Sequence, residues 1–408
     1  MSRPAPGPYV SPPSLAAAAL PEYVARYGAS VLDLDRAVAA APGPPDLIDL
    51  THGDTRAFLP PDWALRGFDT GAADNTEAYT AYRGSASVRE VLAPRVAALL
   101  GRPVDAAREL IVTPGSQGAL FATLSALVGP GDVVMLADPD YFMNERITRY
   151  LGGQIVRAAP VMSADGLLEF SSEDMVRIAA VLPKVMLLSN PNNPLGGVYT
   201  AAAVEQLAAI ARAADATVVV DQLYCRLIFG AATYTHLSAL PGMAERTITL
   251  LGPSKTESMS GYRVGLGVGP PAVVDQMERV LSLASLRTGG YSQQVLRGWL
   301  QDDRDWLAER TVAHEKLRDE VVERLRAIPG VAVQPPAGSS YVFPDCSAVD
   351  GPYGDDDHAL TIAFKQAGAL VSPGYQFGPA GRGRFRINFS QDHDRLSTAL
   401  DRITGVFR

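Results

Sequence analysis

Between residues 87 and 251, segments with helical periodicity alternate with short runs that are apolar throughout. The apolar runs read ELIVTPG, DVVMLADP, KVMLLSNP, TVVVDQ and TITLL. Helices between strands are typical of βαβ units, and strands without apolar–polar alternation are expected where helices cover both faces of a parallel sheet. The alternation therefore predicts an α/β fold, with a large domain built on a mostly parallel sheet that helices cover on both faces.

The pattern changes after about residue 290. A long helical segment with Leu317, Val321 and Leu325 at spacings of four is followed by short strand-like runs such as SSYVF and RFRINF, and by two more helical segments. This order predicts a second, smaller α+β domain. We expect an N-terminal arm and a segment joining the small domain at 1–60, a large domain at 61–290 and the small domain at 291–408.

Composition restricts the partners of this chain. The net charge of −8, without a block of Lys and Arg, disfavours nucleic acid and anionic membranes and favours small molecules. Cys225 and Cys346 are too few for a disulfide framework, and the five histidines lack a ligand spacing, so no metal is expected. No apolar run approaches the roughly 18 residues of a membrane span, and prolines interrupt the N-terminal segment, which predicts a flexible arm and a cytoplasmic protein.

Small and polar residues collect where the predicted strands end. Gly115, Ser116 and Gln117, in PGSQGAL, form a turn that opens a helix. Such a turn presents N–H groups and the positive end of the helix dipole, which suits a phosphate, although ordinary strand-to-helix turns use the same residues. Ligands of open α/β sheets bind beyond the carboxyl ends of the strands, so these turns are the candidate site.

Three charged residues strengthen that expectation. Asp221 follows the run TVVV, where a carboxylate is costly to bury unless it meets a cation; a helix N-cap is the alternative. Lys255 follows the run TITLL, and Arg263 lies eight positions later. An amine near a fixed cation has a lowered pKa and becomes a nucleophile for Schiff-base chemistry, whereas a solvated loop lysine is the alternative. The fork of Arg263 suits a phosphate dianion.

These motifs, in this order, resemble those of class I and II aminotransferases, which are pyridoxal 5′-phosphate (PLP) enzymes of fold type I. The resemblance extends from about Asp49 to the C-terminus and includes PGSQGAL, DPDYF, NPNNPLGG, TVVVDQLY, GPSKTESMSGYR and FRINFS. It implies a PLP cofactor and an enzyme that moves an amino group from an L-amino acid to a 2-oxo acid. It also implies a homodimer with shared active sites.

The resemblance further implies a role for each matching residue. Lys255 would hold the cofactor as an aldimine and move the proton of the substrate Cα. Asp221 would pair with the pyridine nitrogen, which makes the ring an electron sink. Asn193 and Tyr224 would bond the phenolic oxygen of the cofactor, and the ring of Tyr141 would stack on the pyridine.

The remaining matches concern the phosphate, the substrate and the partner subunit. Ligands of the phosphate would be Gly115, Ser116, Gln117, Arg263 and Ser254, which would supply the hydroxyl that Gly252 lacks. Arg386 would bind the substrate carboxylate beside Gly53 and Asn193, and Tyr79 would reach the phosphate of the partner subunit. Leu195 stands where relatives commonly have Thr, which leaves the cofactor contacts there open.

The same residues would serve a β-eliminating lyase of the C–S type, or a decarboxylating or oxidative variant, because these reactions use the same electron sink. Product formed without a 2-oxo acid acceptor would separate elimination from transamination. A PLP-containing transcription regulator needs a basic module ahead of the PLP domain, and residues 1–48 are rich in Pro and Ala. A dinucleotide-binding oxidoreductase is disfavoured because GLGVG has the wrong glycine spacing.

The identity of the substrate stays open. His52, Asp54 and Arg56 lie in THGDTRAF, the segment that lines the substrate entrance of the family, and each is expected to be a solvated surface residue. Arg287 lies near the position from which some relatives reach an acidic substrate side chain in the other subunit, which is a hint of a donor resembling aspartate or glutamate.

Overall fold

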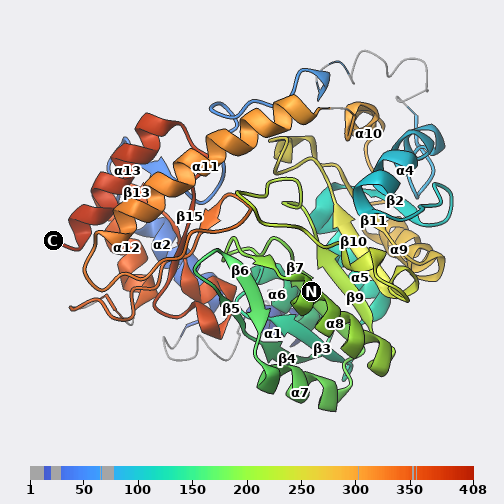
Figure 1. The fold of residues 1–408 in the computed structure, drawn as a ribbon, viewed down its shortest axis with the longest axis horizontal. Coiled ribbons are helices and arrows are strands. Elements are labelled where there is room, and N and C mark those ends of the chain that lie inside the picture. Colours follow the sequence, from blue (N-terminus) through green and yellow to red (C-terminus); the bar gives the residue numbers. More distant parts are fainter. Residues whose placement is uncertain are drawn as a thin grey trace, which may run out of the picture.

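A seven-stranded sheet forms the middle layer of the larger part of the protein, on the right in Figure 1, in the order β2-β11-β10-β9-β7-β3-β4. This computed structural model describes residues 13–19, 29–64, 66, 78–301, 303–351, 353–354 and 356–408. The strands of the sheet are β2 (Leu110–Thr113), β3 (Val133–Ala137), β4 (Gln154–Ala158), β7 (Val185–Ser189), β9 (Thr217–Asp221), β10 (Thr247–Leu251) and β11 (Gly265–Val268). Only β11 runs antiparallel to its neighbours in this sheet, so the predicted mostly parallel α/β architecture is confirmed.

Helices cover both faces of the sheet, which explains why the inner strands β3 and β7 carry apolar side chains on both faces, whereas the edge strand β4, QIVRA, is only partly buried. On β7, Val185 and Leu187 belong to one core, and Met186 and Leu188 belong to the core on the opposite face. The first core is closed by α5 (Gly115–Leu127), α6 (Phe142–Tyr150) and α9 (Pro271–Ala284), and the second by α7 (Ser172–Val181) and α8 (Ala201–Ala214). Neither set of side chains reaches water, so no polar residue is needed at alternate positions.

The strand β11 was not expected, because GLGVG was weighed only as a glycine motif. Its glycines are required by close packing rather than by a nucleotide. A Cβ on Gly265 would lie 2.5 Å from the backbone N of Ser116, and one on Gly267 would lie 2.6 Å from Cε of Met277. The strand therefore lacks the apolar signature that marks its neighbours.

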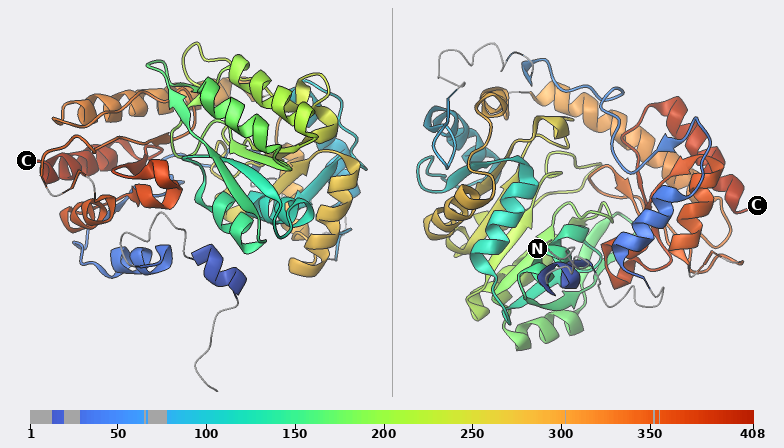
Figure 2. Two further views of the ribbon diagram at one scale, coloured as in Figure 1. Left: turned by 90° about the horizontal axis from the view of Figure 1, so that it is seen from below. Right: turned by 180° about the vertical axis from the view of Figure 1, so that it is seen from behind.

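A smaller unit of antiparallel strands and long helices follows the large sheet in sequence. Its sheet joins β12 (Tyr341–Val342), β15 (Phe385–Asn388) and β14 (Ser372–Pro373), and its helices are α11 (Arg304–Arg326), α12 (Asp357–Ala367) and α13 (His393–Val406). The N-terminal strand β1 (Ile48–Asp49) pairs in parallel with β13 (Ala369–Leu370), and α2 (Val31–Ala40) lies beside α12 (Figure 2). The domain boundaries at 60/61 and 290/291 stay a prediction.

The remaining α-helices and β-strands are peripheral to the site. They are α1 (Pro13–Ala19), α4 (Ala86–Leu100), α10 (Gly290–Gln294), β5 (Pro160–Met162), β6 (Leu167–Phe170) and β8 (Val198–Tyr199). The other residues of the expected N-terminal arm, 1–12 and 20–28, lie outside the described part of the chain. Within the described ranges, none of the helices combines the length and the apolar character that crossing a bilayer requires.

The central sheet predicts a large effect of truncating Leu250, which is fully buried on β10. Leu250→Ala is expected to lower the free energy of unfolding by about 2 to 5 kcal/mol, because the lost contacts leave a cavity. Leu182→Ala, at a site that is 61% exposed, is expected to change it by less than about 0.5 kcal/mol. Denaturant melts of both variants measure the difference, and equal effects would contradict a closed core at β10.

Candidate active site

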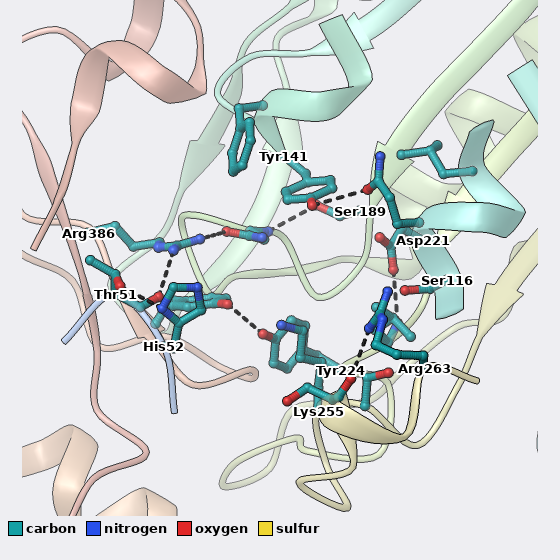
Figure 3. A pocket seen from close by; sticks show the side chains of 18 residues that line it. Thr51, His52, Ser116, Tyr141, Ser189, Asp221, Tyr224, Lys255, Arg263 and Arg386 are labelled. Carbon is teal, nitrogen blue, oxygen red and sulfur yellow. Dashed lines mark hydrogen bonds between the residues drawn. The ribbon is translucent and has the colours of Figure 1, made fainter. Parts of the chain in front are cut away.

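The strand ends of the central sheet meet at one cavity. The ladder registers place Ser189 of β7 opposite Asp221 of β9, and Asp221 opposite Leu250 of β10. Because β11 runs the other way, its first residue, Gly265, lies at the same edge, opposite Thr113 of β2. The cavity at this edge encloses about 200 Å³ (Figure 3). Its wall contains ten of the predicted site residues: Ser116, Gln117, Tyr141, Asn193, Asp221, Tyr224, Ser254, Lys255, Arg263 and Arg386.

The start of α5 and Arg263 form a cup suited to an anion. The helix begins at Gly115 without a side-chain cap, so its first N–H groups are available to a ligand. Gly115 has a φ of +76°, and a Cβ there would lie 2.4 Å from Nη2 of Arg263. Only glycine lets the guanidinium pack so closely against the helix. Arg263 itself has a φ of 51°, a strained conformation of a kind that clusters at functional sites.

Ser254 and Lys255 lie in the turn after β10 and face the same cavity. The Oγ of Ser254 is buried and has no hydrogen-bond partner among the residues that the structure describes. A buried hydroxyl without a partner is costly, and it indicates a ligand atom at this position. Ser254 thus stays a predicted ligand of the phosphate.

Asp221 ends β9 inside the protein, and its carboxylate accepts a hydrogen bond from the N–H of Leu223 at 3.1 Å. Burial raises the pKa of Asp221 to about 6, although that hydrogen bond and the charge of Lys255 act to lower it. No ion pair with this carboxylate occurs among the described residues at salt-bridge distance. A desolvated carboxylate in this state favours a cationic ligand.

Arg386, on β15 of the smaller unit, reaches across to the large sheet. Its Nη1 donates to Oδ1 of Asn193 at 2.7 Å, and its Nη2 donates to the carbonyl of Thr51 and to Oγ of Ser372, both at 3.1 Å. Its Nε is buried without a partner in the described part of the chain. The guanidinium is thus held in place by neutral acceptors and keeps its charge for an anion.

Sequence reasoning missed Asp140, which organises two predicted site residues. Its buried carboxylate accepts hydrogen bonds from the N–H groups of Tyr141 and Ser189, from Oγ of Ser189 and from Nδ2 of Asn144 and Asn192. Ser189 Oγ in turn accepts from the N–H of Asn193 at 3.0 Å. Asp140 therefore orients Tyr141 and the turn of Asn193. The acidic residue inside the motif DPDYF, directly before Tyr141, could have indicated this role.

Sequence reasoning also missed Tyr341, on β12. The hydroxyl of Tyr224 donates to that of Tyr341 at 2.7 Å, and the guanidinium of Arg386 lies 4.1 Å from the centre of the Tyr341 ring. Burial acts to raise the pKa of Tyr341, but the charges of Lys255 and Arg386 and the hydrogen bond from Tyr224 outweigh it, so the pKa lies below its ordinary value. Tyr341 links the two sides of the cavity.

The remaining predicted residues lie at the margin of the site. Gly53 lines a smaller adjoining cavity of about 80 Å³, together with Lys255. Tyr79 is 80% exposed, and the guanidinium of Arg287 lies 4.8 Å from its ring and 4.2 Å from the ring of Tyr82. Neither Tyr79 nor Arg287 contacts the cavity of its own chain. Arg287 also donates from Nε to the carbonyl of Thr80 at 2.7 Å, so its side chain is held beside Tyr79.

The segment THGDTRAF divides into surface and cavity residues. Asp54 uses Oδ1 to accept the N–H of Arg56, which is an ordinary turn at the surface. His52 instead lines both cavities, although its ring is exposed at their mouth. His52 is therefore exposed, as predicted, but it also lines the cavity, which was not predicted.

The donors and acceptors of the cavity fit PLP. Its phosphate matches the start of α5, Arg263 and the free Oγ of Ser254, and a protonated ring nitrogen matches the carboxylate of Asp221. The amine of Lys255 matches the carbonyl of the cofactor. A lysine beyond the strands of an α/β sheet, beside a buried carboxylate and an anion cup, is the arrangement expected of a PLP-dependent enzyme of fold type I.

Comparisons with known proteins confirm this class. The family model of class I and II aminotransferases matches residues 45–403. The arginine–pyruvate transaminase of Pseudomonas aeruginosa is 30% identical over 93% of this chain and 95% of its own length. A crystal structure of an aspartate aminotransferase from Rhodobacter sphaeroides has a TM-score of 0.83 at 40% identity, and covers 90% of this chain and 93% of that one. The chain belongs to the class I and II aminotransferase family, whose cofactor is PLP.

The electrostatics of Asp221 predict a pH-dependent gain in stability from Asp221→Asn in the cofactor-free protein. The folded-state pKa of about 6 lies above the unfolded value of about 3.9, so the wild type loses stability as the pH rises between these values. The asparagine variant avoids this loss, and is expected to gain stability relative to wild type at about pH 8 but not at about pH 4. Urea melts at both pH values measure the gain; a gain independent of pH would contradict this electrostatic explanation.

Proposed function

We propose that the protein is an aminotransferase that moves an amino group from an L-amino acid to a 2-oxo acid. The observation that carries this proposal is the convergence of Lys255, Asp221 and Arg386 on one cavity. Bound PLP supplies an electron sink that stabilises negative charge on the substrate Cα. The side chains of the cavity bind, orient and move protons around it.

Lys255 would attach the cofactor through its amine. Once the substrate amine has displaced it, the freed Lys255 amine would carry the proton from the substrate Cα to the cofactor. Asp221 holds the ring nitrogen protonated. Asn193 and Tyr224 bond the phenolic oxygen, and Tyr141 packs against the ring. The phosphate is held by Gly115, Ser116, Gln117, Ser254 and Arg263.

Arg386 binds the substrate α-carboxylate through its fork, beside Gly53. Since Asn193 accepts from Nη1 of Arg386, one amide side chain contacts both the carboxylate-binding guanidinium and the cofactor. Tyr341 stabilises the guanidinium from one side through its ring.

The active protein is proposed to be a homodimer. The exposed side chain of Tyr79, beside Arg287, is offered to the partner's cavity, where Tyr79 would bind the phosphate. The proposed location is the cytoplasm, and the proposed partners are amino acids and 2-oxo acids rather than nucleic acid or membrane.

The relatives differ in the substrates for which they are named, arginine and pyruvate in one case and aspartate in another. We therefore propose only the reaction class from the site that these relatives share. The class of substrate is inferred from residues of this chain. The relatives named above are a transaminase and an aminotransferase, which favours transamination over elimination, and acceptor dependence separates the two reactions.

The central test uses purified enzyme loaded with PLP and a panel of amino acids, with and without 2-oxoglutarate. Transamination predicts loss of the PLP absorbance without the acceptor, recovery of that absorbance when 2-oxoglutarate is present, and sustained product only with the acceptor. Lys255→Ala is expected to lower the rate by at least about 10²-fold. Lys184→Ala, on the surface at an ion pair with Asp132, is the matched control and should leave the rate unchanged. Sustained pyruvate or ammonia without acceptor would instead indicate β-elimination.

Tyr341 offers a second test of the carboxylate site. Tyr341→Leu is expected to raise KM for the amino acid about 5- to 30-fold, because the cation–π contact with Arg386 is lost. Tyr341→Phe keeps the ring and should change KM by less than about twofold. Steady-state kinetics separate the two variants; equal KM values would show that the ring does not support Arg386.

A further inference from the structure

His52 occupies a fixed position in the wall of the cavity. Its carbonyl accepts a hydrogen bond from Nε2 of Gln391 at 2.5 Å, and the neighbouring N–H of Asp54 donates to the carbonyl of Ser390 at 2.7 Å. The carbonyl of Thr51 accepts from Arg386. The backbone on both sides of His52 is thus attached to the segment that carries the carboxylate-binding arginine.

The neighbours of the His52 ring determine which nitrogen carries the proton. The hydroxyl of Thr51 donates to Oδ1 of Asp49 at 2.5 Å and lies 2.7 Å from Nδ1 of His52. A hydroxyl has one hydrogen to donate, and the hydroxyl of Thr51 donates it to the carboxylate of Asp49. Thr51 Oγ1 must therefore accept from His52, so Nδ1 bears the hydrogen and Nε2 of the neutral ring presents a lone pair. Nε2 has no hydrogen-bond partner among the described residues.

The surrounding charges favour the neutral ring. Partial burial lowers the pKa of His52, Asp49 opposes this effect, and Lys255 and Arg386 lower the pKa further. The pKa therefore falls below its ordinary value, and the imidazole is uncharged near neutral pH.

The cations of the cavity have other roles in the proposed function. Lys255, Arg263 and Arg386 are assigned to the cofactor, its phosphate and the α-carboxylate, and no other Lys or Arg of the described chain lines this cavity. A carboxylate at the end of the substrate side chain would meet the lone pair of Nε2. A carboxamide or hydroxyl would instead donate a hydrogen bond to it.

We infer that His52 is a specificity residue that selects amino acids whose side chain ends in an uncharged hydrogen-bond donor over their acidic counterparts. The inference rests on the proposed aminotransferase function. A site built to accept a hydrogen bond favours a group that can donate one. Because 83% of the His52 side chain is exposed at the mouth of the cavity, this discrimination acts once the substrate side chain covers Nε2 and displaces water from it.

The test compares amide and acid substrates of the same shape, glutamine with glutamate and asparagine with aspartate. With the PLP-loaded enzyme, at least one amide is expected to exceed its acid by about 10-fold or more in kcat/KM. His52→Leu should reduce that ratio to within about threefold, mainly through KM of the amide, and His52→Gln, which retains an acceptor oxygen, should restore part of it. His393→Leu, an exposed histidine on α13, is the matched control.

Acid substrates preferred by the wild type, or an amide-to-acid ratio unchanged in His52→Leu, would overturn the inference. An acid preference that disappears in Arg287→Ala would assign side-chain recognition to Arg287 instead. Calorimetric titration of each amino acid into the PLP-loaded Lys255→Ala variant measures affinity without turnover, and the absorbance of the wild-type enzyme reports conversion of the cofactor. An amide preference in binding with no conversion of the cofactor would refute the proposed function and leave the recognition by His52 standing, so the two failures are distinguishable.

Discussion

The parallel ladder through β7, β9 and β10 is the constraint on which the site depends. It holds Ser189, Asp221 and Leu250 at one level of the sheet, and the antiparallel β11 brings Gly265, with Arg263 before it, to the same edge. A slip of one residue would exchange the two faces of a strand, and both faces are packed against helices. The packing of the two cores therefore sets the height at which the polar groups face the cavity.

The cavity holds several groups that the described part of the protein leaves uncompensated. Asp221 is a desolvated carboxylate with a raised pKa, and Arg386 Nε and Ser254 Oγ are buried without partners. Arg263 adds a left-handed backbone conformation. Each feature lowers the stability of the ligand-free protein. A ligand that carries the opposite charge or supplies the missing hydrogen-bond partner offsets this loss. Binding energy thus stabilises what folding alone leaves strained.

Much of the fold was predictable because its signals are local. Uniformly apolar runs between amphipathic helices identified the sheet, and the residues after each run identified Lys255 and Asp221. Asp140 and Tyr341 were missed because their importance comes from contacts with distant residues. Asp140 connects two strand ends, and Tyr341 contacts Tyr224 and Arg386 from separate elements. The strand β11 was missed because close packing requires glycine where an apolar side chain would otherwise mark it.

The sequence by itself determined the α/β architecture, the family and the chemical types of the groups at the strand ends, because periodicity and turn residues act over a few positions. Only the tertiary structure decided which polar groups share a cavity and which protonation state each of them has. The proton on Nδ1 of His52 depends on Thr51 and Asp49, and the place of its ring depends on Gln391, 339 positions away in the chain. Such long-range contacts form only when the smaller unit packs against the N-terminal segment, and no local pattern encodes them.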